Sequence, residues 1–370
     1  MPYTNLDGTT PDKGLLDILK WQVGDRIAGR RRVVKDTFVT PRREADLAAI
    51  AAPGCHATWV GHATWLLRQG GQLVATDPIW SDRIHTVRRH APAGVPLEAS
   101  PPIDVVTVSH SHFDHLDLPT LRRIGPRPLY VVPKDNAEIL RSAGLPNVVE
   151  LDWWETHRVG ELAVTLVPAQ HWSMRAPWDR NERLWGGFVY ESAEGTSYHA
   201  GDTAMSEVVF RRIAERFPSI DWAMLPIGAY DPPWFMKPQH MGPEEAIEAW
   251  ELLGAEHLLA MHWGTFKLTD EPMGEPPERA RAGWAEKGHA AERLWILDLG
   301  ETRLLTRQEG RWAGYSYRWN EAQDDAELVV FNVLWALLNG ALIWLGARLT
   351  MRMLTGYGAT SDGFDMVAPS

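Results

Sequence analysis

The sequence predicts an α/β (α+β) fold in which β-sheets are covered by helices. Short apolar and β-branched runs alternate with helical patterns along the middle of the chain, and Gly70-Gly71 joins two such runs as a hairpin. Mixed strands and helices with hairpins favour sheets packed beneath helices. At 370 residues, with 45% hydrophobic and 23% charged residues, the chain can bury the core of one large or two ordinary domains.

The predicted elements follow one another from the N-terminus. Residues 1–13 are polar and are expected to be loose, and residues 15–27 have the spacing of an amphipathic helix that ends in a basic stretch. Short strands are expected on both sides of Gly61 and directly after the glycine pair. The later predictions are strands at 104–108, 129–132, 148–151, 162–167, 187–191 and 197–199, and helices at 118–124, 135–143 and 243–253.

Three parts are expected along the chain: an N-terminal amphipathic arm (1–55), a central domain (56–310) and a C-terminal extension (311–370) with a loose tail. The extension contains an uncharged apolar stretch, 328–347. About twenty such residues can span a bilayer, but acidic residues before it and arginines after it oppose a simple span from the cytoplasm. Asn332 and Asn339 can share one helix face, which also suits a buried, interface-lying or homodimer-forming helix.

Charge and cysteine content limit the partners and the compartment. The net charge of −11 gives no support to a nucleic-acid partner. A single cysteine, Cys55, excludes an intramolecular disulfide and fits a reducing compartment, and no secretory signal opens the chain. We therefore expect a cytoplasmic protein. The basic end of the first helix suits an anionic membrane surface, or equally packing on the central domain.

A loop after the strand at 104–108 concentrates residues that bind metals. Within nine residues it holds three histidines and two aspartates, namely His110, His112, Asp114, His115 and Asp117. Imidazole combined with carboxylate suits zinc, iron or manganese better than calcium or magnesium. Four close ligands exceed what one tetrahedral zinc takes from a single loop, so two ions are expected.

Further metal-type residues come later in the chain, each beyond a β-type run: His171, Asp202 and His262. Strand ends on one edge of a sheet converge in space, so these side chains can face the first loop. His240 follows a loop rich in proline and aromatic residues and precedes a predicted helix. A lone histidine at any of these places is more often structural, but their joint placement indicates a shared metal site.

The motif from His110 to His115, taken with the three later residues, resembles the ligand set of the metallo-β-lactamase superfamily. The resemblance implies a four-layer αββα sandwich with a dinuclear zinc site. It implies that one zinc is held by His110, His112 and His171, the other by Asp114, His115 and His262, and that Asp202 bridges the two.

Flanking segments are similar to the N-acyl-phosphatidylethanolamine-hydrolysing phospholipase D family, over about residues 56–305. They include Trp59-Val-Gly-His-Ala-Thr64, Thr76-Asp-Pro-Ile79, Gln239-His240 and His262-Trp-Gly-Thr-Phe266. This resemblance implies a phospholipid substrate, hydrolysed to N-acylethanolamine and phosphatidic acid by a metal-bridging hydroxide.

Two residues are candidates for catalysis beside the metals. Asp114 is expected to take part in catalysis as well as to bind a metal. His240 is expected to contact the phosphate or to protonate the leaving group. The alternative for His240 is a residue that only begins the following helix. Asp117 is expected either to orient a ligand histidine or to cap the helix that follows it.

The candidate substrate-binding residues are His62, Tyr230 and Trp234. His62 could instead shape a turn beside Gly61, and the aromatic rings could instead pack in the core. The runner-up function is a metal-dependent hydrolase of another ester or phosphodiester, such as a lactone or a small metabolite. A nuclease is disfavoured by the acidic balance, and a non-catalytic binding module by the complete ligand set.

Overall fold

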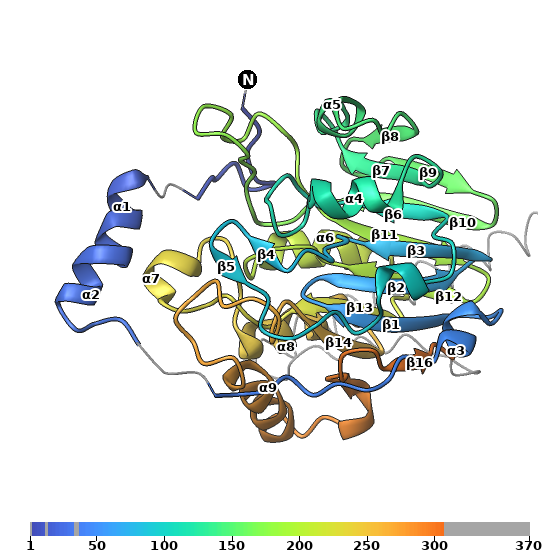
Figure 1. Ribbon diagram of the computed structural model, residues 1–370. Helices are drawn as coiled ribbons and strands as arrows, with labels where there is room; N and C mark the ends of the chain where they lie inside the picture. Colours follow the sequence, from blue (N-terminus) through green and yellow to red (C-terminus); the bar gives the residue numbers. More distant parts are fainter. Residues whose placement is uncertain (1, 12–13, 33–36, 307–370) are drawn as a thin grey trace, which may run out of the picture. The chain divides into compact units, whose positions relative to one another are not determined.

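Residues 2–11, 14–32 and 37–306 are described by the computed structural model of the chain (Figure 1). Its strands are β1 (His56–Gly61), β2 (Thr64–Gln69), β3 (Gln72–Thr76), β4 (Arg83–Ile84), β5 (Val87–Arg88), β6 (Val105–Thr107), β7 (Leu129–Pro133), β8 (Val148–Leu151), β9 (Thr156–Val159), β10 (Leu162–Val167), β11 (Gly187–Ser192), β12 (Gly195–His199), β13 (Trp222–Pro226), β14 (His257–Met261), β15 (Leu294–Trp295) and β16 (Thr302–Leu304).

The helices lie between and around these strands. They are α1 (Leu15–Leu19), a π-helix (Lys20–Gly24), α2 (Asp25–Ile27), α3 (Leu47–Ala51), α4 (Leu118–Ile124), α5 (Ala137–Ser142), α6 (Glu207–Arg216), α7 (Pro233–Met236), α8 (Pro243–Leu253) and α9 (Glu275–Glu286), with single 3₁₀ turns at Leu97–Ala99 and Ala291–Arg293.

The strands form two mixed sheets and a small β4–β5 hairpin. Among the described residues, one sheet has the order β16-β1-β2-β3-β6-β7-β8 and the other β15-β14-β13-β12-β11-β10-β9. In the first sheet the neighbours from β16 to β3 are antiparallel and those from β3 to β8 are parallel. In the second, β9 to β12 are antiparallel and β12 to β15 are parallel. Each sheet thus combines hairpins with crossover connections.

Alternation along the strands divides the core into layers. In β2, Trp65 and Leu67 belong to the apolar cluster shared by the two sheets, whereas Leu66 belongs to the cluster on the outer face of the first sheet. In β7, Val131 points inward and Tyr130 outward. Successive side chains of a strand point to opposite faces, so a sheet buried on both faces reads as an unbroken apolar run.

Helices cover the outer face of each sheet. Ile50 of α3, Leu121 of α4 and Leu140 of α5 pack into the outer cluster of the first sheet. The helices α6, α8 and α9 supply buried side chains to the large cluster that contains the second sheet, and the ring of Trp250 in α8 lies 4.4 Å from that of Trp284 in α9. The layer order is therefore helix, sheet, sheet, helix, which confirms the predicted αββα sandwich (Figure 1).

Local sequence explains where α8 begins and ends. Pro243 occupies the first turn, where its missing N–H costs no hydrogen bond. The carboxylate of Glu245 accepts from the backbone N–H of Gly242 at 3.1 Å, which satisfies a free donor at the helix start. Gly254 then adopts a left-handed conformation (φ 61°) and stops the helix. These bounds match the predicted helix, and they fix the segment that precedes it.

The prediction that the first residues are loose is wrong for 2–11. The backbone N–H of Tyr3 donates to the carbonyl of Asn181 at 2.7 Å, and its hydroxyl donates to Asp135 at 2.5 Å. Asn5 is buried, with only 2% of its surface exposed. The partners lie more than a hundred residues away in sequence, so a local polar pattern could not reveal them.

The predicted apolar helix at 328–347 and the loose tail lie outside the described residues. Within the described ranges, every helix is too short or too polar to reach across a bilayer.

Candidate metal centre

The predicted ligands follow strands that end at one edge of each sheet. Strands β1, β3 and β6 run in the same direction, because β2 is antiparallel to both β1 and β3 and β6 is parallel to β3. In the second sheet β10, β12 and β14 share one direction for the same kind of reason. Four predicted ligands follow these strand ends, namely His110, His171, Asp202 and His262. His62 and Asp77 follow the other two.

One group of ligands gathers three imidazoles around a common point. Nε2 of His110 lies 2.8 Å from Nδ1 of His112, and Nε2 of His171 lies 3.3 Å from the same atom. Oδ2 of Asp202 lies 4.0 Å from Nε2 of His110 and 3.9 Å from Nε2 of His171. Ligands bound to one zinc at about 2.0–2.2 Å are separated by such distances. The four atoms therefore suit one metal ion.

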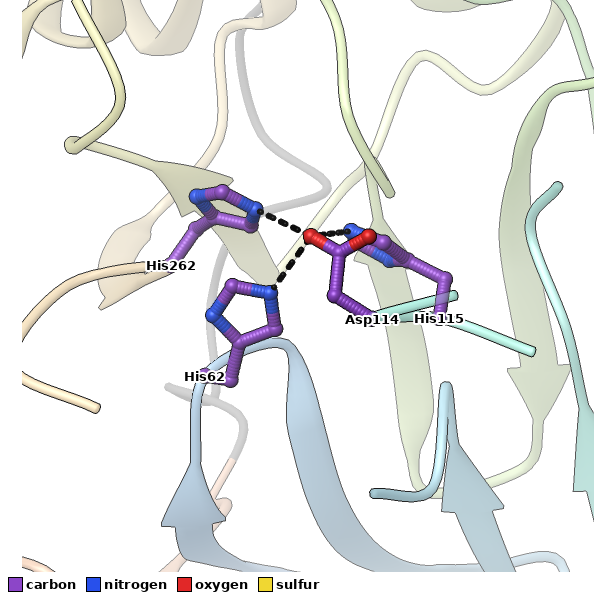
Figure 2. Close-up of side chains that lie close together, drawn as sticks. All are labelled: His62, Asp114, His115 and His262. Atoms are coloured by element: carbon purple, nitrogen blue, oxygen red, sulfur yellow. Dashed lines mark hydrogen bonds and ion pairs between the residues drawn. The ribbon is translucent and has the colours of Figure 1, made fainter. Parts of the chain in front are cut away.

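A second group lies beside the first and shares Asp202. Nε2 of His262 is 3.1 Å from Oδ1 of Asp202 and 3.7 Å from Oδ2 of Asp114. Nε2 of His115 is 3.2 Å from Oδ2 of Asp202 and 3.5 Å from Oδ2 of Asp114. Figure 2 shows the rings of His62, His115 and His262 converging on one oxygen of Asp114. The structure thus brings together all seven predicted ligands in two adjoining groups.

Burial and polarity support a cation between these side chains. Nε2 of His115, Nε2 of His262 and Oδ1 of Asp202 are buried, yet none forms a well-directed hydrogen bond within the described part of the chain. Buried polar atoms are normally satisfied, and an unsatisfied cluster requires an explanation. Neutral imidazoles and ionised carboxylates are the protonation states that bind a metal. The donor set therefore fits metal ions.

The pKa values of Asp202, His110 and His112 favour those states. Burial alone would raise the pKa of Asp202, but His115 and His262 beside it hold that pKa well below its usual range. Burial lowers the pKa of His110 well below its usual value and that of His112 to about 4. His115 and His262 are the opposite case: burial lowers the pKa of each, but the carboxylates beside them outweigh this. The pKa of His115 is raised well above its usual value and that of His262 to about 9. A metal ion would replace the proton held there.

Asp77 orients one histidine from each group. Its Oδ2 lies 2.7 Å from Nδ1 of His115, and its carboxylate accepts from both the backbone N–H and the hydroxyl of Ser109 at 2.6 Å. Because that hydroxyl donates to Asp77, it can accept from Nδ1 of His110, which lies 2.9 Å away. Both imidazoles are thereby fixed with Nε2 toward the ligand groups. The sequence predicts only that Asp77 ends a strand and brings polar groups to the rim of the site.

Replacing Asp77 with Asn is expected to weaken metal binding about 10- to 100-fold, because an amide of the same shape cannot accept all three hydrogen bonds. Competition with a chromophoric chelator measures this affinity. Asp152→Asn is the matched control, since that carboxylate is 45% exposed, forms an exposed ion pair with Lys134 and belongs to neither ligand group. Unchanged affinity in Asp77→Asn would show that Asp77 does not orient the ligands.

The expectation that Asp117 orients a ligand histidine is wrong. Asp117 occupies the N-cap position of α4 without a capping hydrogen bond from its side chain. Its Oδ2 accepts from the hydroxyl of Ser81 at 2.6 Å. The carboxylate is therefore directed toward the β3–β4 connection, where Ser81 lies.

Two further residues that the sequence reading missed hold the ligand loops. The guanidinium of Arg175 donates to the carbonyls of Ser111 and Leu116, at 3.0 and 2.9 Å, and so holds both sides of the metal-binding loop. Oδ1 of Asn5 accepts from the backbone N–H of His171 at 3.0 Å. Nδ1 of His171 lies 2.7 Å from the carbonyl of Gln239. The ligand loops are therefore held by distant segments that no local motif reveals.

His62 lies among the ligands and is only 2% exposed. Its Nε2 is 3.1 Å from Oδ2 of Asp114, and its ring centre is 4.0 Å from that of His262 (Figure 2). The backbone is left-handed here (φ 55°) and its carbonyl accepts from the N–H of His262 at 3.0 Å. This position favours a role in holding Asp114 and His262 over direct contact with a substrate.

His240 stands where both ligand groups meet. Its Nδ1 lies 3.8 Å from Oδ2 of Asp202, and its ring centre is 5.2 Å from that of His171 and 5.8 Å from that of His262. Its side chain is 13% exposed. The carbonyl of Met236, in α7, accepts from its backbone N–H at 2.9 Å. His240 is thus available to a bound substrate at the common point of the two groups.

The other two candidate substrate residues, Tyr230 and Trp234, lie in and just before α7. The hydroxyl of Tyr230 donates to Glu275 at 2.9 Å, and the guanidinium of Arg279 stacks over its ring at 4.5 Å. Trp234, in α7, is half-buried, and the ammonium of Lys20 lies 4.3 Å above its ring. Neither joins the ligand groups.

Comparison with known proteins agrees with the ligand geometry. A family model described as a β-lactamase superfamily domain matches residues 73–263, a range that spans all the ligands. The chain belongs to the metallo-β-lactamase superfamily. As a member of that superfamily with a complete set of metal-type residues, it is a metal-dependent hydrolase.

Several relatives of this superfamily member carry names of hydrolases. The chain is 36% identical to "N-acyl-phosphatidylethanolamine-hydrolyzing phospholipase D 1" of Caenorhabditis elegans, over 67% of this chain and 75% of that protein. It is 32% identical to a "metal-dependent hydrolase" of Methanopyrus kandleri, over 66% of this chain and 97% of that one. A solved "possible metal-dependent hydrolase" from Veillonella parvula has a TM-score of 0.57 at 17% identity, over 69% of this chain and 100% of that one, a likeness of fold.

Proposed function

We propose that this superfamily member is a zinc-dependent phosphodiesterase of the phospholipase D type, which hydrolyses N-acyl-phosphatidylethanolamine to N-acylethanolamine and phosphatidic acid. The observation that carries the proposal is the pair of ligand groups that share Asp202, with His240 placed between them. The identity with the C. elegans protein named for this reaction supports the substrate class. The donor set supports two zinc ions per chain, and iron or manganese would suit the same ligands.

The metals would be held by the two groups described above. Bound there, paired divalent ions lower the pKa of a coordinated water to about 7 and stabilise charge on the phosphoryl oxygens. The water oxygen forms a bond to phosphorus, the bond from phosphorus to the ethanolamine oxygen breaks, and the proton released by the water goes to that leaving oxygen. Asp114 stays ionised, because nearby His115 holds its pKa well below the usual range against the effect of burial. Its carboxylate can therefore accept a hydrogen bond from the attacking water and orient it.

His240 would donate a hydrogen bond to the phosphoryl group. Burial lowers its pKa to about 4, so the ring is neutral near neutral pH. A neutral imidazole has one N–H to donate, and this suits contact with a phosphoryl oxygen better than proton transfer to the leaving group. Of the two roles expected from the sequence, we propose the phosphate contact.

The second candidate is a hydrolase of another ester or phosphodiester, such as a lactone. The relative named only as a metal-dependent hydrolase supports this broader class, since the same ligand set serves many substrates.

The proposal is tested with purified, zinc-loaded full-length protein. N-acyl-phosphatidylethanolamine in detergent micelles is compared with a lactone and with bis-p-nitrophenyl phosphate, and chelator-stripped protein serves as the control. We expect release of N-acylethanolamine that is restored when zinc is added back. Hydrolysis of the lactone alone would overturn the lipid assignment and leave the second candidate.

A further inference from the structure

The N-terminal helical arm, residues 14–32, buries one face and exposes the other. Trp21 and Asp25, four residues apart on the inner face, are 7% and 5% exposed. The ring of Trp21 lies 5.0 Å from that of Phe235 in α7, and its Nε1–H donates to Asp270 at 2.8 Å. Arg31 pairs with the same carboxylate at 2.5 Å. The arm is therefore anchored to the domain beside α7, as Figure 1 shows.

The outer face of the arm is apolar. Leu16 and Ile27 are 80% and 82% exposed, and Leu19 and Val23 between them are 47% and 49% exposed. Their spacing of three to four residues places them along one side of the helical segment, opposite Trp21. A docked surface helix normally turns its apolar side inward and its polar side to water. This arm buries Trp21 but leaves a second row of apolar side chains in water.

The exposure is concentrated in this arm. Five of the ten large hydrophobic residues that are exposed in the described part of the chain fall between Leu16 and Ile27, and the rest are scattered. Scattered exposed residues need no explanation, but a contiguous apolar surface marks an interaction site. The arm therefore presents a surface that some partner covers.

The charge around this face suits a membrane. Residues 14–32 contain five basic residues (Lys20, Arg26, Arg30, Arg31, Arg32) and two acidic ones (Asp17, Asp25), a net charge of +3 in a chain whose total is −11. Of the basic side chains, Lys20 and Arg26 are exposed, and Arg30 is 65% exposed and pairs with Asp25. Arg31 and Arg32 pair with carboxylates of the domain. Apolar side chains rimmed by cations are typical of helices that lie in the surface of an anionic bilayer.

We propose that the outer face of the arm, Leu16, Leu19, Val23 and Ile27, lies in an anionic phospholipid bilayer and positions the metal centre at its surface. This rests on the proposed function, since a phospholipid substrate must be reached from a membrane. The connection to the site is short: Trp21 packs on α7, and the last residue of α7, Met236, accepts a hydrogen bond from the backbone of His240. The arm thus contacts α7, and α7 in turn contacts His240.

The test is co-sedimentation of the full-length protein with vesicles of phosphatidylcholine, with and without phosphatidylglycerol. The arm variant combines Leu16→Gln, Leu19→Gln, Val23→Gln and Ile27→Gln. The matched control changes two exposed apolar residues elsewhere, Val208→Gln and Leu304→Gln, which are 49% and 68% exposed. Metal content and thermal midpoint establish that each variant is folded.

We expect wild-type protein to sediment more strongly with the anionic vesicles and less strongly as salt is raised. The arm variant should bind at least about tenfold more weakly, because it loses four apolar anchors, while the control binds like wild type. Since no substrate is present, the result is independent of the lipid hydrolysis test above.

Two results would overturn the proposal. One is equal vesicle binding by wild type and the arm variant. The other is a change of oligomeric state in the arm variant, measured by light scattering, together with wild-type protein that does not bind the vesicles. That result would assign the outer face of the arm to a second copy of the chain.

Discussion

Asp202→Asn is expected to lose at least about 10³-fold in turnover and to retain fewer than two metal ions per chain. Asp202 places Oδ1 3.1 Å from His262 and Oδ2 within 4.0 Å of His110. An amide offers a single oxygen and no charge, so it cannot serve both ligand groups. Paired metals supply several kcal/mol of charge stabilisation, and each 1.4 kcal/mol is a factor of about ten in rate. Elemental analysis and turnover, measured on the same sample, check both parts.

The control for this variant is Asp152→Asn, which removes a carboxylate that is 45% exposed and belongs to neither ligand group. It should keep its metal and its turnover. Two ions per chain and near-normal turnover in Asp202→Asn would mean that the two groups do not depend on a shared carboxylate.

His240→Ala is expected to lower turnover about 10²- to 10³-fold, the usual loss when one donor to a developing charge is removed. Metal content should not change, because each ligand group is complete without His240, to which we assign the phosphate contact. His240 lies as near to Asp202 as the ligands do, at 3.8 Å, so the loss of one ion from this variant would make it a ligand instead. Turnover and metal content are measured in parallel.

His240→Gln separates hydrogen bonding from proton transfer. A neutral side-chain amide can donate a hydrogen bond but cannot act as an acid, so it should recover about tenfold over the alanine variant. Because burial lowers the pKa of His240 to about 4, the ring is neutral at any pH above about 5, and its protonation should affect the rate only on the acid side of that range. Equal rates in the Gln and Ala variants would favour proton transfer instead.

Much of the fold could be predicted because periodicity and local composition fix its elements. Strands β8 and β10 and helices α4 and α8 have the predicted bounds. The two strands are short runs rich in valine and leucine, and the two helices have proline in the first turn and glycine directly after the last residue. Strand β9 and helix α9 were not predicted: β9 alternates polar residues at a sheet edge, and α9 begins with two prolines and has a weak apolar face. Such segments take their structure from tertiary packing rather than from propensity.

The ligand groups were accessible to sequence reasoning because each residue follows a β-type run, and parallel strands carry their ends to one edge. The side chains that orient the ligands could not be predicted in this way. Asn5 contacts His171 across 166 residues, and Arg175 contacts the loop carbonyls across about sixty. These contacts depend on how the loops meet, which the spacing of residue types does not encode. The position of Asp77 directly after β3 was evident from the sequence. Its contact with Nδ1 of His115 is seen only in the structure.

The most direct test of the account follows the oxygen of water during turnover of N-acyl-phosphatidylethanolamine in water labelled with heavy oxygen, with the products separated and analysed by mass spectrometry. Attack on phosphorus predicts one labelled oxygen in the phosphate of phosphatidic acid and none in the N-acylethanolamine. Label in the carboxyl group of a released fatty acid, or in the hydroxyl of N-acylethanolamine, would contradict it.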